Sequence, residues 1–227
     1  MKFNLQKAEK NAAAAVLLCL MFYIILPFLL VKFFPAAAGV MRNFRWTVAL
    51  PMLFIGIMMY LFAKDTFIRR SDFSNLPLLS ISLYSIGMLF VCGGVSFLWL
   101  KLLDILKIAY NKDVPVEDFI RSCSGAELAA AGIFICILTP VFEEVIFRRI
   151  IYDGIRIHLP PVTSAVICSM LFAALHGILF QLVPLCVLGL YFQFLYIREE
   201  KLGVSIYAHF FNNTLAFSVI CIMKFMA

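Results

Sequence analysis

Long runs of apolar residues, separated by short clusters of charged residues, make up most of this chain. A helix needs about 20 consecutive apolar residues to cross a bilayer. Counting the runs between charge clusters predicts seven membrane-spanning helices, or eight if residues 101–123 also enter the bilayer. The pattern therefore predicts an all-α, polytopic membrane helix bundle. The predicted spans are residues 11–34, 46–63, 73–100, a helix starting near 128, and residues 162–175, 185–197 and 204–223.

The fourth predicted span is the least regular. Its apolar part runs only from Leu128 to Phe142, which is short for a membrane helix unless the helix continues through the charges that follow. Ser124 and Glu127 have the spacing of a capping box, which marks a helix start. We therefore expect one helix from this cap, with the charged residues inside it or at its membrane boundary.

The stretch from Ile157 to Ile197 contains no Asp, Glu, Lys or Arg. It is too long for a single span, so we expect two helices there. Gly177 and Pro184 lie between the two predicted helices and mark the turn.

Composition supports a membrane protein. Hydrophobic residues make up 64% of the chain and charged residues 14%, with a mean hydropathy of +1.01. Soluble domains carry about 45–50% apolar and about 25% charged residues. No repeat, linker or soluble insertion interrupts the spans, so residues 1–227 are interpreted as a single integral membrane domain. The seven cysteines lie mostly in apolar runs without a CxxC pair, which favours buried thiols over a zinc ribbon or a disulfide framework.

Basic residues near the span ends predict the orientation. The net charge of +6 comes from lysines and arginines scattered between apolar runs, which argues against nucleic-acid binding. A cytoplasmic N-terminus places most of these clusters in cytoplasmic loops, near anionic lipid headgroups. On this interpretation Arg149 and Arg156 are cytoplasmic anchors. No cleavage site follows the first span, so we expect it to remain as an uncleaved helix.

Charged residues at membrane depth are costly and are candidates for function. On a helix, each residue turns about 100°, so Arg148 lies about 40° from Glu144 and about 140° from Glu143. Glu144 and Arg148 therefore form the expected ion pair of residues four apart. Glu143 has no partner on its own helix, and a carboxylate of this kind can exchange protons as a general base. The alternative is that all these charges are solvated at the headgroup boundary.

Two further pairs of residues share a helix face. Phe172 and His176 are four residues apart in "LFAALHG", and His209 and Asn213 are four apart in "YAHFFNN". Each pair taken alone suits packing, since His and Asn often form hydrogen bonds between membrane helices. Three helices that each bring polar groups to one face indicate a shared functional site. A carboxylate, two imidazoles and a carboxamide can bind and deprotonate water and stabilise an oxyanion.

The ordered set EExxxR, FxxxH and HxxxN resembles the three motifs of the CPBP family. In this chain they are Glu143-Glu144-xxx-Arg148, Phe172-xxx-His176 and His209-xxx-Asn213. The family groups CAAX-processing endopeptidases with bacteriocin-immunity proteins and is also called Abi. The resemblance covers the C-terminal half, roughly residues 124–214. No GxSxG or HExxH motif is present, which argues against serine hydrolases of that type and zincins.

The resemblance implies an intramembrane endopeptidase, similar to type II CAAX prenyl endopeptidases, in a bacterial cytoplasmic membrane. It implies that Glu143 is the catalytic base, that His176 helps activate water, and that His209 and Asn213 stabilise the oxyanion. Glu144, Arg148 and Phe172 would support them. The substrate would be a membrane-associated protein or peptide.

The need for a metal stays open at this point. Family members are often labelled metalloproteases, and Glu143, His176 and His209 are the candidate zinc ligands. The same groups suffice for water activation without a metal, which is the interpretation we favour. Two other functions also remain: a non-catalytic scaffold or immunity protein on the same fold, and a small transporter that relays protons through Glu143.

Overall fold

The computed structural model describes residues 68–110, 115–123 and 125–226. The predicted spans 11–34 and 46–63 lie outside the described residues, as does Ser124 of the predicted capping box. All regular secondary structure in the described part is helical. The main α-helices are α5 (Leu78–Ile105), α6 (Pro115–Ser122), α7 (Gly125–Ile133), α8 (Thr139–Glu144), α9 (Asp153–Ile155), α10 (Pro161–Leu175), α11 (Leu182–Glu199) and α12 (Leu202–Met226).

Four helical segments of the described part are long and apolar enough to cross a membrane. They are Leu78–Ile105, Gly125–Ile155, Leu179–Glu199 and Leu202–Met226, and α10 is a shorter apolar helix. The all-α fold class is confirmed, and the chain is an integral membrane protein. The predicted count of seven to eight spans agrees only roughly, since two of the predicted spans are not described.

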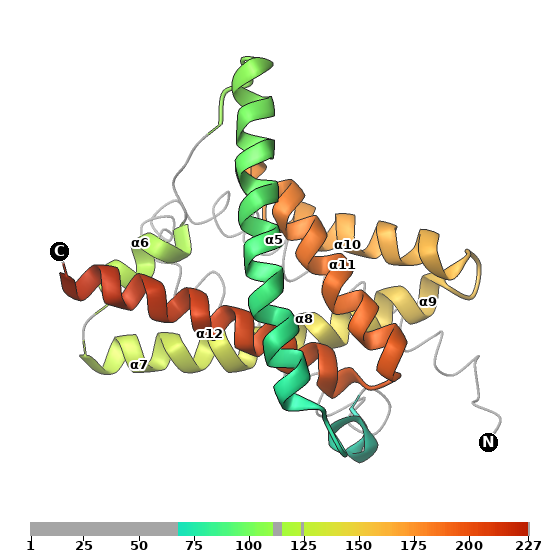
Figure 1. Ribbon diagram of the computed structural model, residues 1–227. Coiled ribbons are helices and arrows are strands. Elements are labelled where there is room, and N and C mark those ends of the chain that lie inside the picture. The colour runs from blue at the N-terminus through green and yellow to red at the C-terminus, as the bar shows by residue number, and fades with distance from the viewer. Residues whose placement is uncertain (1–67, 111–114, 124, 227) are drawn as a thin grey trace, which may run out of the picture.

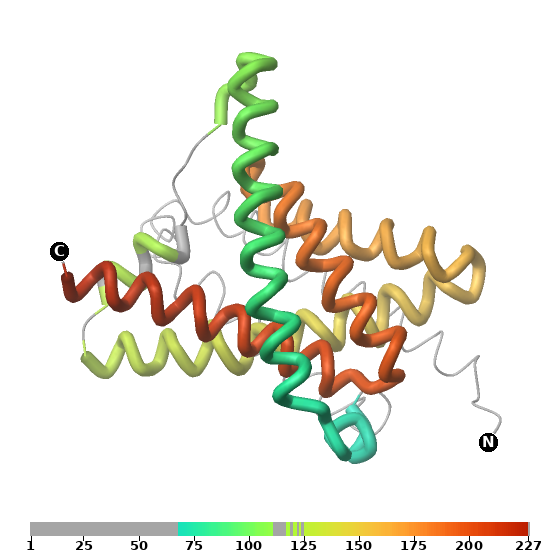
Figure 2. Tube along the Cα trace, in the orientation of Figure 1, coloured from blue at the N-terminus to red at the C-terminus, as the bar shows by residue number. Residues whose placement is uncertain are grey.

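The helices cross at large angles instead of forming a parallel bundle. Figure 1 shows α5 crossing both α11 and α12, and α5 contacts each of them. The tube in Figure 2 shows α12 lying alongside the segment that begins with α7, while α10 pairs with α11 on the other side. α8 and α12 contact each other near the centre of the fold, whereas α7 lies further out, beside the C-terminal part of α12.

One continuous helical segment, Gly125–Ile155, carries the charged stretch. The expectation that the fourth span continues through Glu143, Glu144 and Arg148 is confirmed. Two π-helical stretches widen this segment on either side of α8: η3 (Phe134–Leu138) and η4 (Val145–Tyr152). Such π-helical turns are rare and occur frequently at functional sites.

The break between α10 and α11 differs in part from the prediction. Gly177 follows α10 with a φ of 67°, a left-handed conformation that glycine adopts without strain. Pro184, however, lies within the first turn of α11 instead of in the connection. Proline is tolerated there because the first N–H groups of a helix have no partner within the helix. A short 3-10 turn, η5 (Leu179–Gln181), makes the connection instead.

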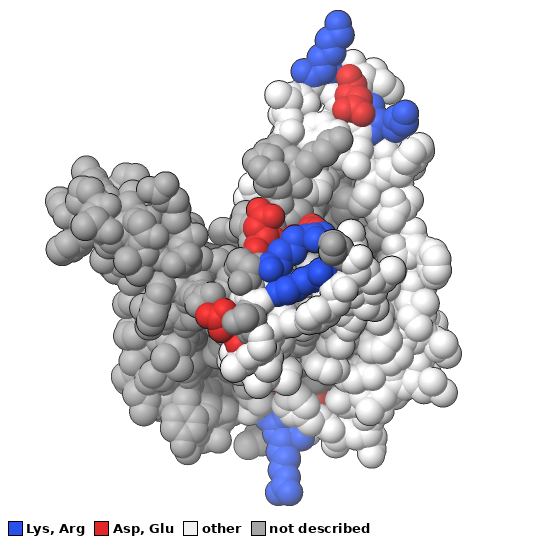
Figure 3. Space-filling view, turned by 90° about the vertical axis from the view of Figure 1, so that its left-hand side faces the viewer, with Lys and Arg blue, Asp and Glu red and all other residues white. Residues whose placement is uncertain are grey.

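The outer surface is mostly apolar. Large side chains of α5 face outward, including Leu79, Phe90 and Phe97, which are 76%, 79% and 61% exposed. Figure 3 shows charged side chains on one face gathered in a few places, with broad uncharged surface between them. This is the surface expected of helices that contact lipid.

The segment before α5 packs onto the start of α12. Asp72, in the 3-10 turn η2 (Arg70–Phe73), is 3% exposed and pairs with Arg149 at 2.5 Å. Its carboxylate also accepts a bond from the N–H of Leu202 at 3.3 Å. Arg149 therefore lies in a buried ion pair, and its expected role as a cytoplasmic anchor stays a prediction. Arg156 is 53% exposed, as expected of a surface residue.

Gly203 offers a test of this packing. A Cβ at this position would overlap the backbone carbonyl oxygen of Asp72. We expect Gly203→Ala to lower stability by about 1–3 kcal/mol through overpacking, measured as the apparent melting temperature in detergent. The matched control is Gly94→Ala, because a Cβ there meets nothing within 4 Å. If both variants melt like the unmodified protein, the η2 turn does not pack on α12 as described.

Candidate active site

Glu144 and Arg148 form a buried ion pair beneath the site. Arg148 Nε lies 2.9 Å from Glu144 Oε2, and the two side chains are 1% and 0% exposed. This is the ion pair that the spacing of four residues predicts. Arg148 also donates through Nη2 to the carbonyl oxygen of Gly189 on α11, at 3.1 Å. The pair thereby ties the Gly125–Ile155 segment to α11.

Three aromatic rings enclose the Arg148 guanidinium. Its central carbon lies 5.4 Å, 5.8 Å and 6.0 Å from the ring centroids of Phe172, Phe192 and Phe147. A cation over aromatic faces is stabilised by the ring quadrupole, and more strongly where water is excluded. The arginine that balances Glu144 is therefore held by packing as well as by charge.

His209 on α12 bridges the two glutamates. Its Nδ1 lies 2.9 Å from Glu144 Oε1, and its Nε2 lies 3.7 Å from Glu143 Oε2. Because an ionised carboxylate can only accept hydrogen bonds, Nδ1 carries a proton toward Glu144. The other ring nitrogen, Nε2, faces Glu143.

Glu143 is the less constrained of the two carboxylates. Its side chain is 14% exposed, whereas that of Glu144 is fully buried. Its buried Oε2 has no hydrogen-bond partner within the described part of the chain. The distance of 3.7 Å to His209 is too long for a direct hydrogen bond. A carboxylate that is partly accessible and unpaired can accept a proton from water.

His176 occupies a different position from the one the motif alone suggests. It is the C-cap residue of α10 and is exposed, and its Nδ1 lies 2.7 Å from the carbonyl oxygen of Phe172. Since a carbonyl accepts, Nδ1 is the donor and Nε2 remains available. No direct bond joins His176 to Glu143 within the described residues. The Phe172 ring lies beside both histidines, 4.8 Å from His176 and 5.9 Å from His209 between ring centroids.

Phe192 is a site residue that sequence reasoning missed. It is fully buried, and its ring stacks on His209 with centroids 4.7 Å apart and an interplanar angle of 19°. The stacking holds the imidazole plane between the two glutamates. No sequence signal could have singled out this phenylalanine, because it is one of 24 in the chain and lies in a mostly apolar run.

The two asparagines of α12 have different partners. Asn213 Nδ2 donates to the carbonyl oxygen of Ile135 at 3.0 Å. Asn212 Nδ2 donates to the Ala208 carbonyl of its own helix at 2.8 Å, and its Oδ1 is buried without a partner among described residues. Asn213 therefore connects α12 to the Gly125–Ile155 segment, whereas the Asn212 amide bonds within α12.

The candidate zinc ligands are not gathered into a metal site. Within the described residues, no three His, Cys, Asp or Glu side chains lie close enough to hold an ion. Glu143 and His209 are neighbours, but no contact joins His176 to either of them within the described residues. The residues present thus do not fit a zinc centre in this conformation, and we derive no step through a metal.

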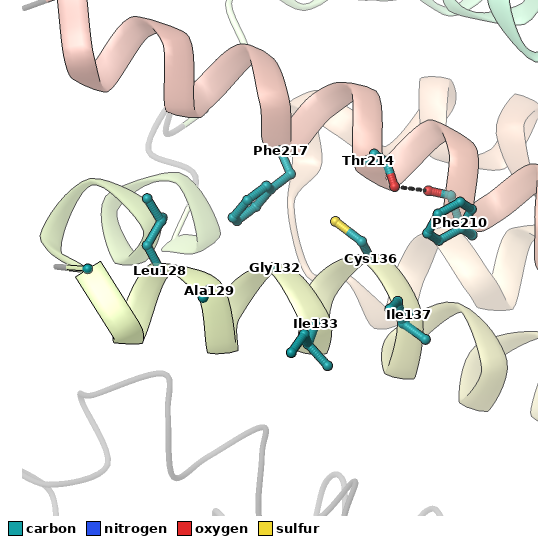
Figure 4. Close-up of a pocket in the computed structure, with 10 residues that line it drawn as sticks. Leu128, Ala129, Gly132, Ile133, Cys136, Ile137, Phe210, Thr214 and Phe217 are labelled. Atoms are coloured by element: carbon teal, nitrogen blue, oxygen red, sulfur yellow. Dashed lines mark hydrogen bonds between the residues drawn. The ribbon is translucent and has the colours of Figure 1, made fainter.

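An apolar groove borders the site. It lies between the α7–η3 segment and α12 and has a volume of about 540 Å³. Figure 4 shows Gly132, Cys136 and Ile137 on one side and Phe210, Thr214 and Phe217 on the other. Phe210 and Thr214 directly follow His209 and Asn213 in the chain, so the inner end of the groove adjoins the polar cluster.

Comparison with known proteins supports the family resemblance. The family model described as "Type II CAAX prenyl endopeptidase Rce1-like" matches residues 125–215, which include all three motifs. Over these residues the chain resembles the CPBP family. The predicted resemblance is thus confirmed.

A curated relative supports the same family. Over 78 residues the chain is 35% identical to a Bacillus subtilis (strain 168) protein named "Putative membrane peptidase YdiL". The match covers 34% of this chain and 32% of that relative, so it spans about a third of the relative's length. No solved structure matches the chain.

Proposed function

We propose that this protein is an intramembrane endopeptidase that hydrolyses peptide bonds with water activated by Glu143. The observation that carries the proposal is the asymmetry of the two adjacent glutamates. Glu144 is locked between Arg148 and His209 at 2.9 Å from each. Glu143 keeps an unpaired oxygen that faces His209 Nε2. One carboxylate fixes the geometry, and the other is left to accept a proton.

In the proposed reaction, Glu143 takes a proton from a water molecule as that water attacks the scissile carbonyl. The tetrahedral intermediate carries a negative oxygen, which hydrogen-bond donors must stabilise. The donors are His209, once Nε2 is protonated, and the second N–H of the Asn213 amide, which has no partner among the described residues. Glu143 then passes its proton to the departing amine.

The charges of the cluster suit this role for His209. Two ionised glutamates and Arg148 together carry a net charge of −2 + 1 = −1, so a protonated His209 makes the buried cluster neutral. Buried charges are stabilised when they are paired in this way. In the doubly protonated form, His209 would donate through Nδ1 to Glu144 and through Nε2 to an oxyanion.

His176 is assigned a supporting role through water. Its available Nε2 and exposed position suit a contact with the attacking water. Because no direct bond links it to Glu143, we place at least one water molecule between them. Phe172 holds His176 in position in two ways. Its ring contacts the imidazole, and its backbone carbonyl accepts a hydrogen bond from His176 Nδ1.

The surroundings of the cluster support a proposal for the substrate class. The apolar groove of Figure 4 opens at the side of two membrane helices, which suits a membrane-associated protein or peptide that enters from the bilayer. We place the protein in a bacterial cytoplasmic membrane with a cytoplasmic N-terminus, as a single domain whose catalytic core is residues 124–214.

The proposal is tested with purified protein in lipid nanodiscs and a library of quenched fluorescent peptides, with and without a chelator. We expect cleavage of some peptides, lost in Glu143→Gln and unchanged by the chelator. Loss of cleavage with chelator, restored by zinc, would instead make the protein a metallopeptidase. If no peptide is cleaved but a cellular phenotype survives Glu143→Gln, the protein is a scaffold or immunity protein. Proton-coupled flux in liposomes, lost in the same variant, would indicate a transporter.

A further inference from the structure

A backbone carbonyl next to the site lacks its helical donor. In an α-helix, the Ile135 carbonyl would accept from the N–H of Thr139, but that N–H donates to Phe134 in the π-helical turn. In a π-helix, the Ile135 carbonyl would accept from residue 140, five positions on. Residue 140 is a proline and has no N–H. Neither the α-helical nor the π-helical backbone donor to this carbonyl is therefore available.

The Asn213 amide occupies this acceptor. Its Nδ2 donates to Ile135 O at 3.0 Å, across 78 positions in the chain. The amide belongs to the same face of α12 as His209, which is four residues earlier and bonds Glu144 at 2.9 Å. Two hydrogen bonds thus join α12 to the Gly125–Ile155 segment, one on each side of Pro140.

These two bonds determine how α12 is aligned with the helix that carries Glu143. Sliding one helix along the other by a single residue displaces it by about 1.5 Å, which would break both bonds. The 3.7 Å separation of His209 Nε2 from Glu143 Oε2 depends on this alignment. The buried Pro140 lies three residues before Glu143, so its effect on the backbone falls within one turn of the proposed base.

We propose that Pro140 is a positioning residue for Glu143. By removing a backbone donor, it leaves the Ile135 carbonyl for Asn213, and this bond sets the alignment of α12 with the Gly125–Ile155 segment. The catalytic consequence of this inference rests on the proposed peptidase function. The hydrogen bond from Asn213 to the Ile135 carbonyl, and its dependence on Pro140, do not depend on that function.

The first test observes the carbonyl itself. Protein labelled with ¹³C carbonyl isoleucine and ¹⁵N cysteine gives one NMR signal for each Ile–Cys peptide bond, at Ile135, Ile167 and Ile220. We expect Asn213→Ala to shift the Ile135 signal and to leave the Ile167 signal unchanged. In the double variant Pro140→Ala/Asn213→Ala, the new backbone N–H binds the carbonyl, and the Ile135 signal returns toward its original position. If Asn213→Ala leaves this signal in place, or the double variant does not restore it, the link does not exist.

The second test separates positioning from folding. Alanine favours a helix interior far more than proline, so we expect Pro140→Ala to melt at the same or a higher temperature. Its backbone N–H competes with Asn213, so we expect kcat to fall about 10- to 100-fold, as for small misplacements of catalytic groups, with KM unchanged. The control Pro184→Ala, at a buried proline of α11, should keep kcat within about twofold of the unmodified enzyme.

Unchanged kcat in Pro140→Ala would overturn the positioning role even if the carbonyl test succeeds. If the unmodified protein cleaves no peptide, the proposed function fails instead, and the alignment is then read from the ring ¹⁵N signals of the three histidines. In that case Pro140→Ala should move the His209 signals and leave those of His158 unchanged. Unmoved His209 signals would contradict the inference.

Discussion

Glu143→Gln is expected to reduce peptide cleavage by about 10²- to 10⁴-fold, the usual contribution of a general base. Glutamine keeps the size and shape of glutamate but cannot accept the proton of the attacking water. The loss should appear in kcat, because peptide binding does not require a proton acceptor. The measurement is steady-state cleavage of the best quenched peptide in nanodiscs.

A matched substitution shows whether the loss is specific. Glu199→Gln makes the same chemical change at the end of α11, where the side chain is 31% exposed and pairs with Arg198. We expect its cleavage rate to stay within about twofold of the unmodified enzyme, since exposed ion pairs contribute little. His176→Ala should also abolish cleavage while the protein still inserts into membranes. Wild-type turnover in both Glu143→Gln and His176→Ala would show that the site assignment is wrong.

Arg148→Ala is expected to cause the largest loss of stability. Removing one partner of a buried ion pair leaves an uncompensated charge and costs about 3–5 kcal/mol. At about 2–4 °C per kcal/mol for a chain of this length, the apparent melting temperature should fall by roughly 6–20 °C. The substitution also removes the bond to Gly189 and the contacts with three phenylalanine rings.

Two companion variants identify the cause of this loss. Arg198→Ala removes an arginine whose side chain is 53% exposed and should change stability by about 0–1 kcal/mol. Arg148→Met combined with Glu144→Gln removes both charges and keeps much of the volume, so we expect it to recover part of the lost stability. If Arg148→Ala melts like Arg198→Ala, the buried ion pair does not stabilise the fold.

Helical periodicity was enough to predict the pairing of Glu144 with Arg148. The two residues are four positions apart, and this spacing brings side chains together on any helix, whatever surrounds it. The same arithmetic separates Glu143 from Arg148. The all-α class and the extension of the fourth span through the charged stretch also follow from local patterns, because apolar run length limits what can cross a bilayer.

Partners from other helices were not predictable in this way. The spacing of His209 and Asn213 places both on one face of α12, but it does not say which group each one meets. His209 bonds Glu144 as well as facing Glu143, and Asn213 bonds the backbone of Ile135. The family resemblance implied an oxyanion role for Asn213 and did not reveal this carbonyl. Its α-helical donor is lost to the π-helical turn, and its π-helical donor is lost because residue 140 is proline.

Burial of charge was also misjudged from the sequence. Arg149 follows an apolar run and was expected at the cytoplasmic surface, yet it pairs with Asp72, which is 77 positions earlier. Composition cannot distinguish an anchoring arginine from a buried one when the partner is so distant in the chain.

The sequence by itself determined the helical class, the membrane setting, the family resemblance and the set of candidate polar residues. These depend on short-range spacing and on motif order, which can be read along one chain. Only the tertiary structure decided which glutamate is locked, which ring stacks on His209, and how Asn213 holds α12 against the Gly125–Ile155 segment. Those contacts depend on the crossing of helices distant in sequence, and their packing is set by shape and burial, which no local pattern encodes.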